Sequence, residues 1–235
     1  MSLTSIIIGG TSGIGLETAR YLNAHGYNVI VGARTPIDDK EGVKFSAIDV
    51  TDEASIEHFF SSLDLDKIDS IVYTAGTTTP KKSITDFTVD EYQKVHNVNL
   101  LGAILILKYA FPMLQKAKGK VVMVSSFASR TYSNFSGFEY TVSKAGLSGL
   151  VKQLAVEWAS DGVLINSVFP SMVETPMLRN NVNSSVLEPI EKAIPLGRIA
   201  TTEEIAAAIE FLISDRNTYI TGAGIDINGG QFLSA

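Results

Sequence analysis

Short runs of β-branched residues alternate with longer helical patterns along the whole chain, and this alternation constrains the fold more than any other feature. Strands are predicted at residues 5–8, 28–31, 43–48, 70–73, 120–125, 164–168 and 224–227. Helical patterns lie between them, near residues 14–25, 53–62, 90–114, 139–160 and 202–213. Strands that alternate with helices form parallel sheets, because each helix carries the chain back to the same edge. The sequence therefore predicts an α/β fold with a doubly wound, mostly parallel seven-stranded sheet and helices on both faces.

Composition excludes several classes of protein. Hydrophobic residues make up 45% and charged residues 19% of the 235 residues, which excludes disorder, and no repeat or linker divides the chain, so we expect one domain over residues 1–235. A net charge of −6 disfavours nucleic acid as a partner. Without cysteine, and with three widely spaced histidines, no metal site is expected.

The first residues of the chain and its apolar runs bear on where in the cell the protein is expected. The first residues lack the basic segment of a secretory signal, and the densest apolar run, residues 100–107, is too short to span a bilayer. We therefore expect a soluble, cytoplasmic protein with no membrane partner.

A glycine-rich segment, residues 9–15, directly follows the first predicted strand and opens the first predicted helix. Its spacing is Gly-x3-Gly-x-Gly, and glycines there permit a tight turn and let the backbone approach a pyrophosphate at a helix N-terminus. A plain glycine turn is the alternative interpretation, but the strand–turn–helix context favours phosphate binding. The predicted contacts are Gly9, Thr11, Ser12, Gly13, Ile14 and Gly15.

A tyrosine and a lysine four residues apart, Tyr140 and Lys144, share one face of the helix after the fifth strand. That strand ends in Ser125 and Ser126, and Asn99 lies inside an otherwise apolar helix. A free tyrosine has a pKa of about 10, and a nearby ammonium would lower that pKa toward working pH. Each feature has an alternative interpretation. The tyrosine and lysine could lie on a surface helix, the two serines could simply end the strand, and Asn99 could be a buried amide that needs hydrogen-bond partners.

Two helices predict contacts between subunits. Residues 98–107 are apolar on all sides except Asn99 and Gly102, and a helix with no polar face is buried on both sides. One side can face the sheet, so we expect the other to meet a second subunit. In the helix near 139–160, Gly146 and Gly149 would let another helix approach closely. These features predict a homo-oligomer.

Further motifs follow in order along the chain. They are Gly9-x3-Gly13-Ile14-Gly15, Ala75-Gly76, Val98-Asn99-Leu100-x-Gly102, Ser126, Tyr140-x3-Lys144, Asn166-x-Val168-x-Pro170, Val173-x-Thr175, Pro195-Leu196-Gly197-Arg198, Ile220-Thr221-Gly222 and Asn228-Gly229-Gly230. With these motifs the chain resembles the single-domain short-chain dehydrogenase/reductase family over nearly its whole length. The resemblance implies a Rossmann-type fold and a homotetramer or homodimer.

The resemblance also implies hydride transfer between a nicotinamide cofactor and a carbonyl or alcohol carbon of a small-molecule substrate. Tyr140 would be the acid/base, Ser126 would hydrogen-bond the substrate oxygen, Lys144 would hold the nicotinamide ribose, and Asn99 would position a water in the proton path. Asp49 and Val50 would contact adenine. The remaining cofactor contacts implied are Gly9, Thr11, Ser12, Gly13, Ile14, Gly15, Ala75, Gly76, Tyr140, Lys144, Pro170, Val173 and Thr175.

The choice of nicotinamide depends on the end of the second strand. NAD enzymes place a carboxylate there, whereas this strand continues as Val31-Gly32-Ala33-Arg34-Thr35, with no acid and one arginine. A guanidinium can bind a 2′-phosphate, and an exposed arginine without a partner is the alternative interpretation. We predict NADP(H), bound in part by Arg34, with NAD(H) as the alternative.

Three departures from the family pattern carry expectations of their own. Ile8 stands where the family has Thr, and Tyr73-Thr74-Ala75-Gly76 replaces Asn-Asn-Ala-Gly, so we expect looser hydrogen bonds between these two loops. Ser171 replaces a glycine, which predicts a turn with negative φ or with strain. Ser126 precedes the tyrosine by one residue more than usual, which leaves Ser125 as the alternative serine.

The substrate is less well specified by the sequence. Aromatic residues between the serine and the tyrosine, namely Phe127, Tyr132, Phe135 and Phe138, predict either an apolar pocket wall or part of the core. Arg130 either meets an anionic substrate or lies in solvent. The asparagine- and serine-rich residues 177–200 predict a mobile lid.

The main functional prediction is an NADP(H)-dependent alcohol dehydrogenase or carbonyl reductase. One alternative is an epimerase or dehydratase of the extended branch, whose members usually carry a longer C-terminal substrate domain. The other is a dinucleotide sensor or regulator without turnover. Such proteins generally lack the tyrosine or the lysine, and this chain has both.

Overall fold

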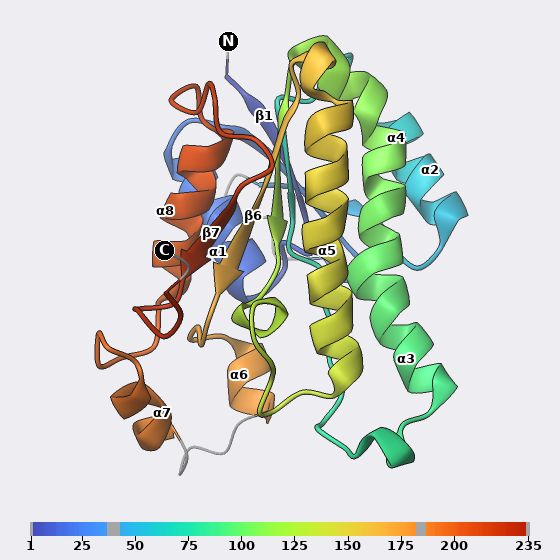
Figure 1. Cartoon of the computed structure of the whole chain (residues 1–235). Coiled ribbons are helices and arrows are strands. Elements are labelled where there is room, and N and C mark those ends of the chain that lie inside the picture. Colours follow the sequence, from blue (N-terminus) through green and yellow to red (C-terminus); the bar gives the residue numbers. More distant parts are fainter. Residues whose placement is uncertain (1, 37–42, 182–186, 234–235) are drawn as a thin grey trace.

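The computed structural model describes residues 2–36, 43–181 and 187–233, and its strands form one parallel sheet in the order β3-β2-β1-β4-β5-β6-β7 (Figure 1). The bounds are β1 Thr4–Ile8, β2 Asn28–Ala33, β3 Lys44–Ala47, β4 Ser70–Tyr73, β5 Lys120–Val124, β6 Leu164–Pro170 and β7 Gly224–Ile227. The strand order reverses between β1 and β4, which is where ligands bind in sheets of this kind. The predicted seven-stranded doubly wound sheet is confirmed.

Five helices cover the two faces of the sheet. On one face lie α2 (Glu53–Ser62), α4 (Gly102–Ala117) and α5 (Phe138–Glu157), and on the other lie α1 (Gly13–Ala24) and α8 (Thr202–Ile213). Because successive strand residues point to opposite faces, Ile6 and Ile8 of β1 pack with the first group and Ile7 packs with the second. Each face of the sheet thus packs against helices through its own cluster of buried hydrophobic residues.

The helix predicted near 90–114 is longer and less regular than expected. It begins as α3 (Val89–His96), passes through a π-helical stretch at Asn97–Leu101, and continues as α4. Its inner side is fully buried, with Ile106, Ala110 and Leu114 at 0% exposure. Its outer side is partly exposed in the single chain, with Leu101 at 47% and Ile104 at 39%, so the expected contact with a second subunit stays a prediction.

The continuous helix Val89–Ala117 is long and apolar enough to cross a membrane by length and composition, and it is the one such helix in the described part of the chain. The sequence-based expectation, drawn from residues 100–107 alone, understated its length. Its apolar inner side packs against the sheet as part of the core cluster that also holds β4 and β5. The packing accounts for its composition as that of a core helix.

Two short helices, α6 (Pro176–Asn181) and α7 (Leu187–Ala193), occupy the stretch predicted as a lid, and residues 182–186 of that stretch lie outside the described residues. Both helices lie beyond the C-terminal ends of the strands (Figure 1). The sequence analysis did not predict them, because it took the asparagines and serines between residues 180 and 185 as the mark of a loop.

Candidate active site

The turn between β1 and α1 requires glycine at its tightest points. Gly9 has φ +90°, and a Cβ placed on it would lie 2.5 Å from the Ala75 amide nitrogen. A Cβ on Gly15 would lie 2.4 Å from both the Gly9 carbonyl oxygen and Thr74 Oγ1. Because no side chain fits at either position, the loop packs directly against the segment after β4.

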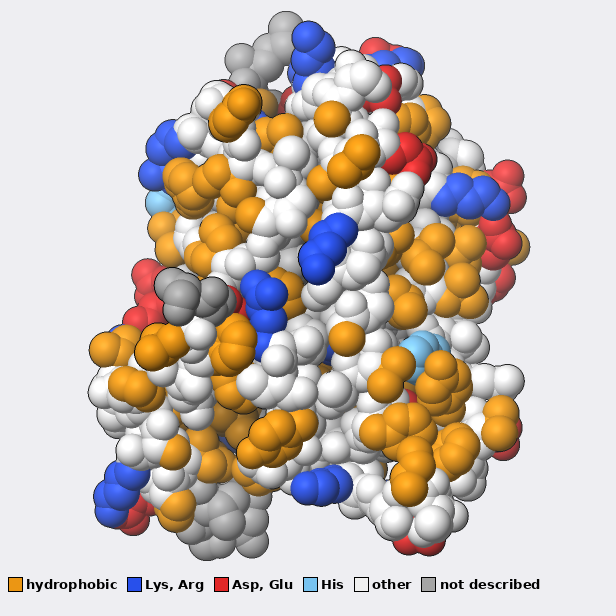
Figure 2. Space-filling view, in the orientation of Figure 1, with side chains coloured by type: hydrophobic (Ala, Val, Ile, Leu, Met, Phe, Trp, Pro, Cys, Tyr) orange, Lys and Arg blue, Asp and Glu red, His pale blue; other side chains and the backbone are white. Residues whose placement is uncertain are grey.

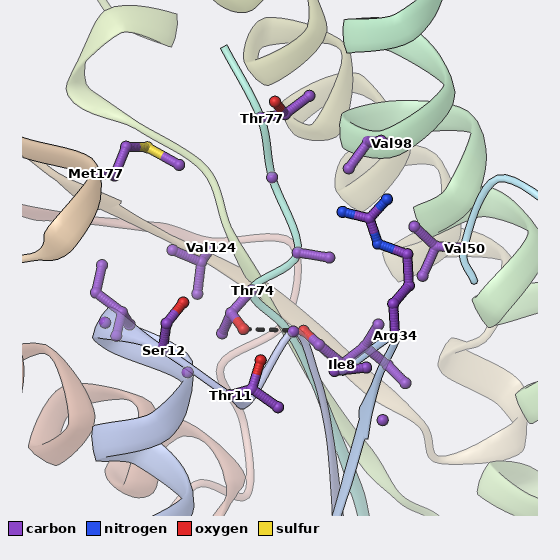
Figure 3. Close-up of a pocket in the computed structure, with 18 of the residues that line it drawn as sticks. Ile8, Thr11, Ser12, Arg34, Val50, Thr74, Thr77, Val98, Val124 and Met177 are labelled. Atoms are coloured by element: carbon purple, nitrogen blue, oxygen red, sulfur yellow. Dashed lines mark hydrogen bonds between the residues drawn. The ribbon is translucent and has the colours of Figure 1, made fainter. Parts of the chain in front are cut away.

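Hydrogen bonds hold these two segments together. The carbonyl oxygen of Ile8 accepts from the Thr74 hydroxyl at 2.9 Å, the Thr74 amide at 2.8 Å and the Ala75 amide at 2.9 Å (Figure 3). The threonine hydroxyl itself joins the two loops, in addition to the two backbone amides, and the expected difference from the family pattern stays a prediction. Ser171 also makes its turn without positive φ, since Lys118 is the one non-glycine residue with positive φ in the described chain.

A cavity of about 390 Å³ opens above this turn. Most predicted cofactor contacts line it, namely Gly9, Thr11, Ser12, Gly13, Ile14, Gly15, Arg34, Asp49, Val50, Ala75, Gly76 and Thr175. Its wall also includes Thr74, Thr77, Lys94 and Val98, which sequence reasoning missed. Figure 3 shows several of these side chains around the open space.

The N-terminus of α1 faces this cavity with its backbone amides uncapped by a side chain. Ser12 is the N-cap residue and makes no side-chain capping bond, and the first turn holds no acidic side chain. Free amides and the positive end of the helix dipole favour an anion there. The close-packed glycines and the uncapped helix end together fit the pyrophosphate of a dinucleotide.

Arg34 is exposed at the end of β2 and extends beside Val50 toward Val98 (Figure 3). Across the same cavity, Asp49 accepts hydrogen bonds from the amide of Thr51 at 2.9 Å and from its hydroxyl at 2.7 Å. These hydrogen bonds, helped by the charge of Arg34, hold the pKa of Asp49 below its usual value. The rim thus offers a guanidinium beside a firmly ionised carboxylate.

A second cavity, of about 360 Å³, adjoins the first. The two share Ile14, Thr74, Gly76, Val124, Thr175 and Met177. The second is also lined by Ser125, Ser126, Tyr140, Lys144, Pro170 and Val173. The structure therefore brings the predicted serine, tyrosine and lysine together, next to the predicted cofactor contacts.

The two serines after β5 point to different partners. Ser125 is 3% exposed and donates its hydroxyl to the backbone carbonyl of Lys144 at 2.9 Å. Ser126 accepts from the Ala128 amide at 3.1 Å and hydrogen-bonds the phenol of Tyr140. Because Ser125 holds the helix backbone and Ser126 meets the phenol, the geometry favours Ser126 as the serine of the site.

Burial sets the protonation of the tyrosine–lysine pair. It raises the pKa of Tyr140, an effect that the hydrogen bond with Ser126 opposes, and it lowers the pKa of Lys144 to about 8. Lys144 Nζ donates to the Val124 carbonyl at 2.8 Å and lies 5.9 Å from the centre of the Tyr140 ring. The expected lowering of the Tyr140 pKa by Lys144 does not occur in the protein alone, so the phenol is protonated at neutral pH.

Asn99 is fully buried in the π-helical stretch and lines neither cavity. Its amide donates to the Thr77 carbonyl at 2.9 Å and to Ser143 Oγ at 3.0 Å, and its oxygen accepts from the Thr77 amide at 2.7 Å. A Cβ on Gly76 would meet both Lys144 Nζ, at 3.4 Å, and Asn99 Oδ1, at 3.6 Å. Asn99 therefore lies just behind the loop that lines the cavities.

Glu139 is a buried carboxylate that sequence reasoning missed, although it directly precedes Tyr140. It is 4% exposed and accepts a hydrogen bond from the hydroxyl of Thr79, whose carbonyl in turn accepts from the Gly137 amide at 3.0 Å. Nearby, burial lowers the pKa of His96 against the opposing charge of Glu139. No group of three or more metal-binding side chains occurs in the described residues.

The aromatic residues predicted to form a pocket wall divide between two places. Phe127, Tyr132 and Phe135 line the second cavity. Phe138 does not, because it points away and packs edge-on against Phe87, with ring centres 5.2 Å apart.

Comparisons with known proteins show which chains this one is similar to. A family model described as enoyl-(acyl carrier protein) reductase matches residues 9–231. The 3-oxoacyl-[acyl-carrier-protein] reductase FabG of Aquifex aeolicus is 34% identical, over 97% of this chain and 96% of its own. The 2-dehydro-3-deoxy-L-rhamnonate dehydrogenase (NAD(+)) of Sphingomonas sp. is 30% identical, over 97% and 94%. The structure of ElxO with NADP bound is similar with a TM-score of 0.90 and 29% identity, covering 98% of this chain and 99% of that one.

Proposed function

The chain belongs to the short-chain dehydrogenase/reductase family of oxidoreductases, and we propose that it interconverts an alcohol and a ketone or aldehyde by hydride transfer with NADP(H). The observation that carries this proposal is the pair of adjoining cavities. One is built for a dinucleotide by the glycine loop and the N-terminus of α1, and the other holds Ser126, Tyr140 and Lys144. In this proposal the whole chain, residues 1–235, acts as one cofactor-binding and catalytic domain.

The chain's own residues supply binding and proton transfer. A bound nicotinamide supplies or accepts the hydride. Tyr140 donates its phenolic proton to the substrate oxygen during reduction and takes it back during oxidation. Ser126 holds that oxygen in line with the phenol. Lys144 binds the nicotinamide ribose, and its charge favours the ionised phenol once the site is filled.

Further residues bind and position the cofactor. The amides of the glycine loop and of the first turn of α1 bind the pyrophosphate. Asp49 and Val50 contact adenine, and Pro170, Val173 and Thr175 hold the carboxamide side. Asn99 positions a water behind Lys144, which the approach of both side chains to Gly76 supports.

The preference for NADP(H) over NAD(H) rests on Arg34. It lines the dinucleotide cavity, and no acidic side chain follows β2 at residues 34–36. A guanidinium there can form a charge-assisted pair with a 2′-phosphate. ElxO, whose solved structures hold NADP and NADPH, supports the same choice, while the NAD(+) in the name of the Sphingomonas relative favours the alternative.

Two other functions compete with this one. A dinucleotide sensor needs the first cavity only, whereas this chain also holds a tyrosine and a lysine together in a second cavity. An epimerase or dehydratase of the extended branch would use the same tyrosine. The single-domain relatives that match nearly end to end favour the alcohol–carbonyl reaction.

We also propose that the protein is cytoplasmic and forms a homotetramer or homodimer. Support for assembly comes from the outer face of α4 and α5, where Leu101, Ile104, Val142 and Val156 are 39–80% exposed and nothing lies within 4 Å of a Cβ placed on Gly149.

Incubation with NADPH and a panel of ketones and aldehydes, followed by the loss of NADPH absorbance, tests the function. We expect turnover of at least one carbonyl, with NADH a weaker hydride donor. Tight NADPH binding in a fluorescence titration without turnover of any carbonyl or alcohol would favour the sensor instead.

A further inference from the structure

The second cavity differs from the first in the chemistry of its wall. Away from Tyr140, its wall carries aromatic, aliphatic and thioether side chains, namely Phe127, Tyr132, Phe135, Met172, Met177, Leu178 and Ile190. They come from the loop after β5, the end of β6, and α6 and α7. Figure 2 shows apolar side chains gathered at the lower left of the molecule, over the region of α6 and α7. A substrate that enters this cavity contacts mainly apolar surface.

Charge is nearly absent from this wall. Among the described residues that line the second cavity, Lys144 is the one charged side chain. Its ammonium already donates to the Val124 carbonyl and belongs to the proposed cofactor site. The described wall therefore offers no ion-pair partner to a charged substrate group.

Several charged residues close to this region in sequence are engaged elsewhere. Arg130, considered above as a contact for an anionic substrate, donates to Asp226 at 3.1 Å and to the Gly224 carbonyl at 3.1 Å. Its guanidinium also stacks 3.9 Å from the centre of the Phe169 ring. Arg179 pairs with Glu174 at 2.5 Å, and Lys192 pairs with Glu188 at 2.6 Å.

We propose that the substrate of this enzyme is an uncharged, largely apolar ketone or secondary alcohol of modest size. This inference rests on the proposed function, since it concerns the cavity that holds Tyr140. Burying a charge without a partner is strongly unfavourable, whereas an apolar body gains from leaving water. The cavity volume of about 360 Å³ lies toward the lower end of ligand pockets, which suits a short chain or a single ring.

The polar groups on the wall are compatible with a neutral substrate. Ser133 Oγ already accepts from the amides of Phe135 at 3.2 Å and Ser136 at 2.9 Å. The side-chain amides of Asn134 and Gln231 also line the cavity. An uncharged amide can hydrogen-bond a hydroxyl or carbonyl of the substrate, but it cannot neutralise a carboxylate or an ammonium.

Three methyl ketones of similar reach test the proposal: 2-heptanone, 5-oxohexanoate and (4-oxopentyl)trimethylammonium. We expect kcat/KM for the neutral ketone to exceed that for each charged ketone by about 100-fold or more. Binding is measured separately, by calorimetric titration of each corresponding alcohol into the protein saturated with NADPH, where no turnover occurs. The neutral alcohol should bind most tightly.

A variant pair examines the wall itself. Gln231→Lys adds an ammonium to the cavity and should raise kcat/KM for 5-oxohexanoate by about tenfold relative to 2-heptanone. Leu233→Lys is the matched control, because Leu233 is 80% exposed and lies off the cavity, and it should leave that ratio unchanged.

The outcomes separate the two proposals. A charged ketone that is turned over and bound as well as the neutral one would overturn the substrate class and leave the oxidoreductase intact. Preference for the neutral alcohol in binding, with no turnover of any carbonyl or alcohol, would support the cavity chemistry and contradict the proposed function.

Discussion

Tyr140 lies where proton transfer would take place, hydrogen-bonded to Ser126 on the wall of the second cavity. Tyr140→Phe removes one hydroxyl and keeps the ring, so NADPH binding should remain near normal. Turnover should fall by about 10²–10⁴-fold, because the substrate oxygen loses its positioned acid. The measurement is a fluorescence titration of NADPH beside steady-state rates with any carbonyl that the wild type reduces.

Tyr132→Phe is the matched control for this change. Tyr132 lines the same cavity but is 66% exposed, so loss of its hydroxyl should leave the rate within a few-fold of wild type. Near-wild-type turnover in Tyr140→Phe would show that the chemistry does not run through this phenol.

Lys144 combines a proposed role in cofactor binding with a cost in stability. Lowering its pKa from 10.5 to about 8 means that the buried ammonium disfavours folding by about 3 kcal/mol at neutral pH. Lys144→Met should therefore raise the free energy of unfolding by about 1–2 kcal/mol, after the lost bond to Val124 is counted. It should also abolish NADPH binding and turnover, since it removes the proposed ribose contact.

The sign of the pH dependence tests this explanation. Between about pH 8 and pH 10 the unfolded lysine keeps its proton while the folded one loses it, so the cost fades and wild-type stability rises with pH. The stability gap between Lys144→Met and wild type should shrink over that range. Lys152→Met replaces an exposed lysine of the same helix. Its stability should stay close to that of the wild type over this whole pH range.

Arg34 determines cofactor preference in our proposal. Arg34→Asp removes a charge-assisted pair and adds a repulsive carboxylate, so NADPH affinity should fall relative to NADH. Lys44→Asp makes the same change in charge at an exposed position on β3 that does not line the cavity. It should leave the ratio of the two dissociation constants unchanged. A wild-type protein that binds NADH as tightly as NADPH would contradict the role of Arg34.

Residue-level prediction from sequence worked where spacing along one element decides which side chains meet. Tyr140 and Lys144 share a helix face, and the glycines of the turn follow one another closely, so their positions could be predicted. The bond from the Thr74 hydroxyl to the Ile8 carbonyl joins residues far apart in the chain, and nothing local in the sequence marks it. The direction of Phe138, away from the cavity that its aromatic neighbours line, likewise depends on tertiary packing.

At the scale of elements, the bond between Glu139 and Thr79 joins the start of α5 to the segment after β4. Glu139→Ala leaves the Thr79 hydroxyl unpaired in a buried place, so unfolding free energy should drop by about 1–3 kcal/mol. Because α5 carries Tyr140 and Lys144, kcat should fall as well, with less change in KM. Glu139→Gln keeps an acceptor for the Thr79 hydroxyl, so its unfolding free energy and its kcat should both be close to those of the wild type.

A double-mutant cycle with Thr79→Val shows whether the bond itself is responsible. The two changes should be non-additive in both stability and kcat if the pair acts as a unit. Additive losses, or a Glu139→Gln variant as impaired as Glu139→Ala, would contradict a positioning role for Glu139.

Strands and long helices could be predicted from the chain because burial imposes a period on their residues. All seven strands occur within two residues of their expected bounds, and α8 was expected at its observed bounds. The π-helical stretch at Asn97–Leu101 could not be predicted, since the bonds of Asn99 found there join it to Thr77 and Ser143, which are far away in the sequence. Helices α6 and α7 are only six and seven residues long, too short for the local sequence to specify a helix by itself.

At the scale of the whole molecule, the outer face of α4 and α5 carries the prediction of assembly. Within the chain, Leu100 covers Gly146, but the space above Gly149 is open. Gly149→Arg should therefore fold normally as a single chain, while the arginine would clash with a subunit packed on this face. Light scattering should show an oligomer for wild type and a smaller species for the variant.

Ser61→Arg is the matched control. It adds the same charge at an exposed position of α2 and should leave the oligomer intact. A monodisperse wild-type monomer at micromolar concentration would rule the prediction out. The apolar composition of residues 98–107 predicted that this helix has an outer face available to a second subunit. Composition alone could not show which side of the helix packs against the sheet and which side stays exposed.

The wall shared by the two cavities has a consequence for the order of events in a catalytic cycle. Because Ile14, Thr74, Gly76, Val124, Thr175 and Met177 border both spaces, whatever occupies the first cavity becomes part of the surface of the second. A substrate arriving first would meet an incomplete surface, with its reacting carbon next to open solvent. In the proposed reaction we therefore expect cofactor to enter before substrate and to leave after product, so that its departure ends each turnover.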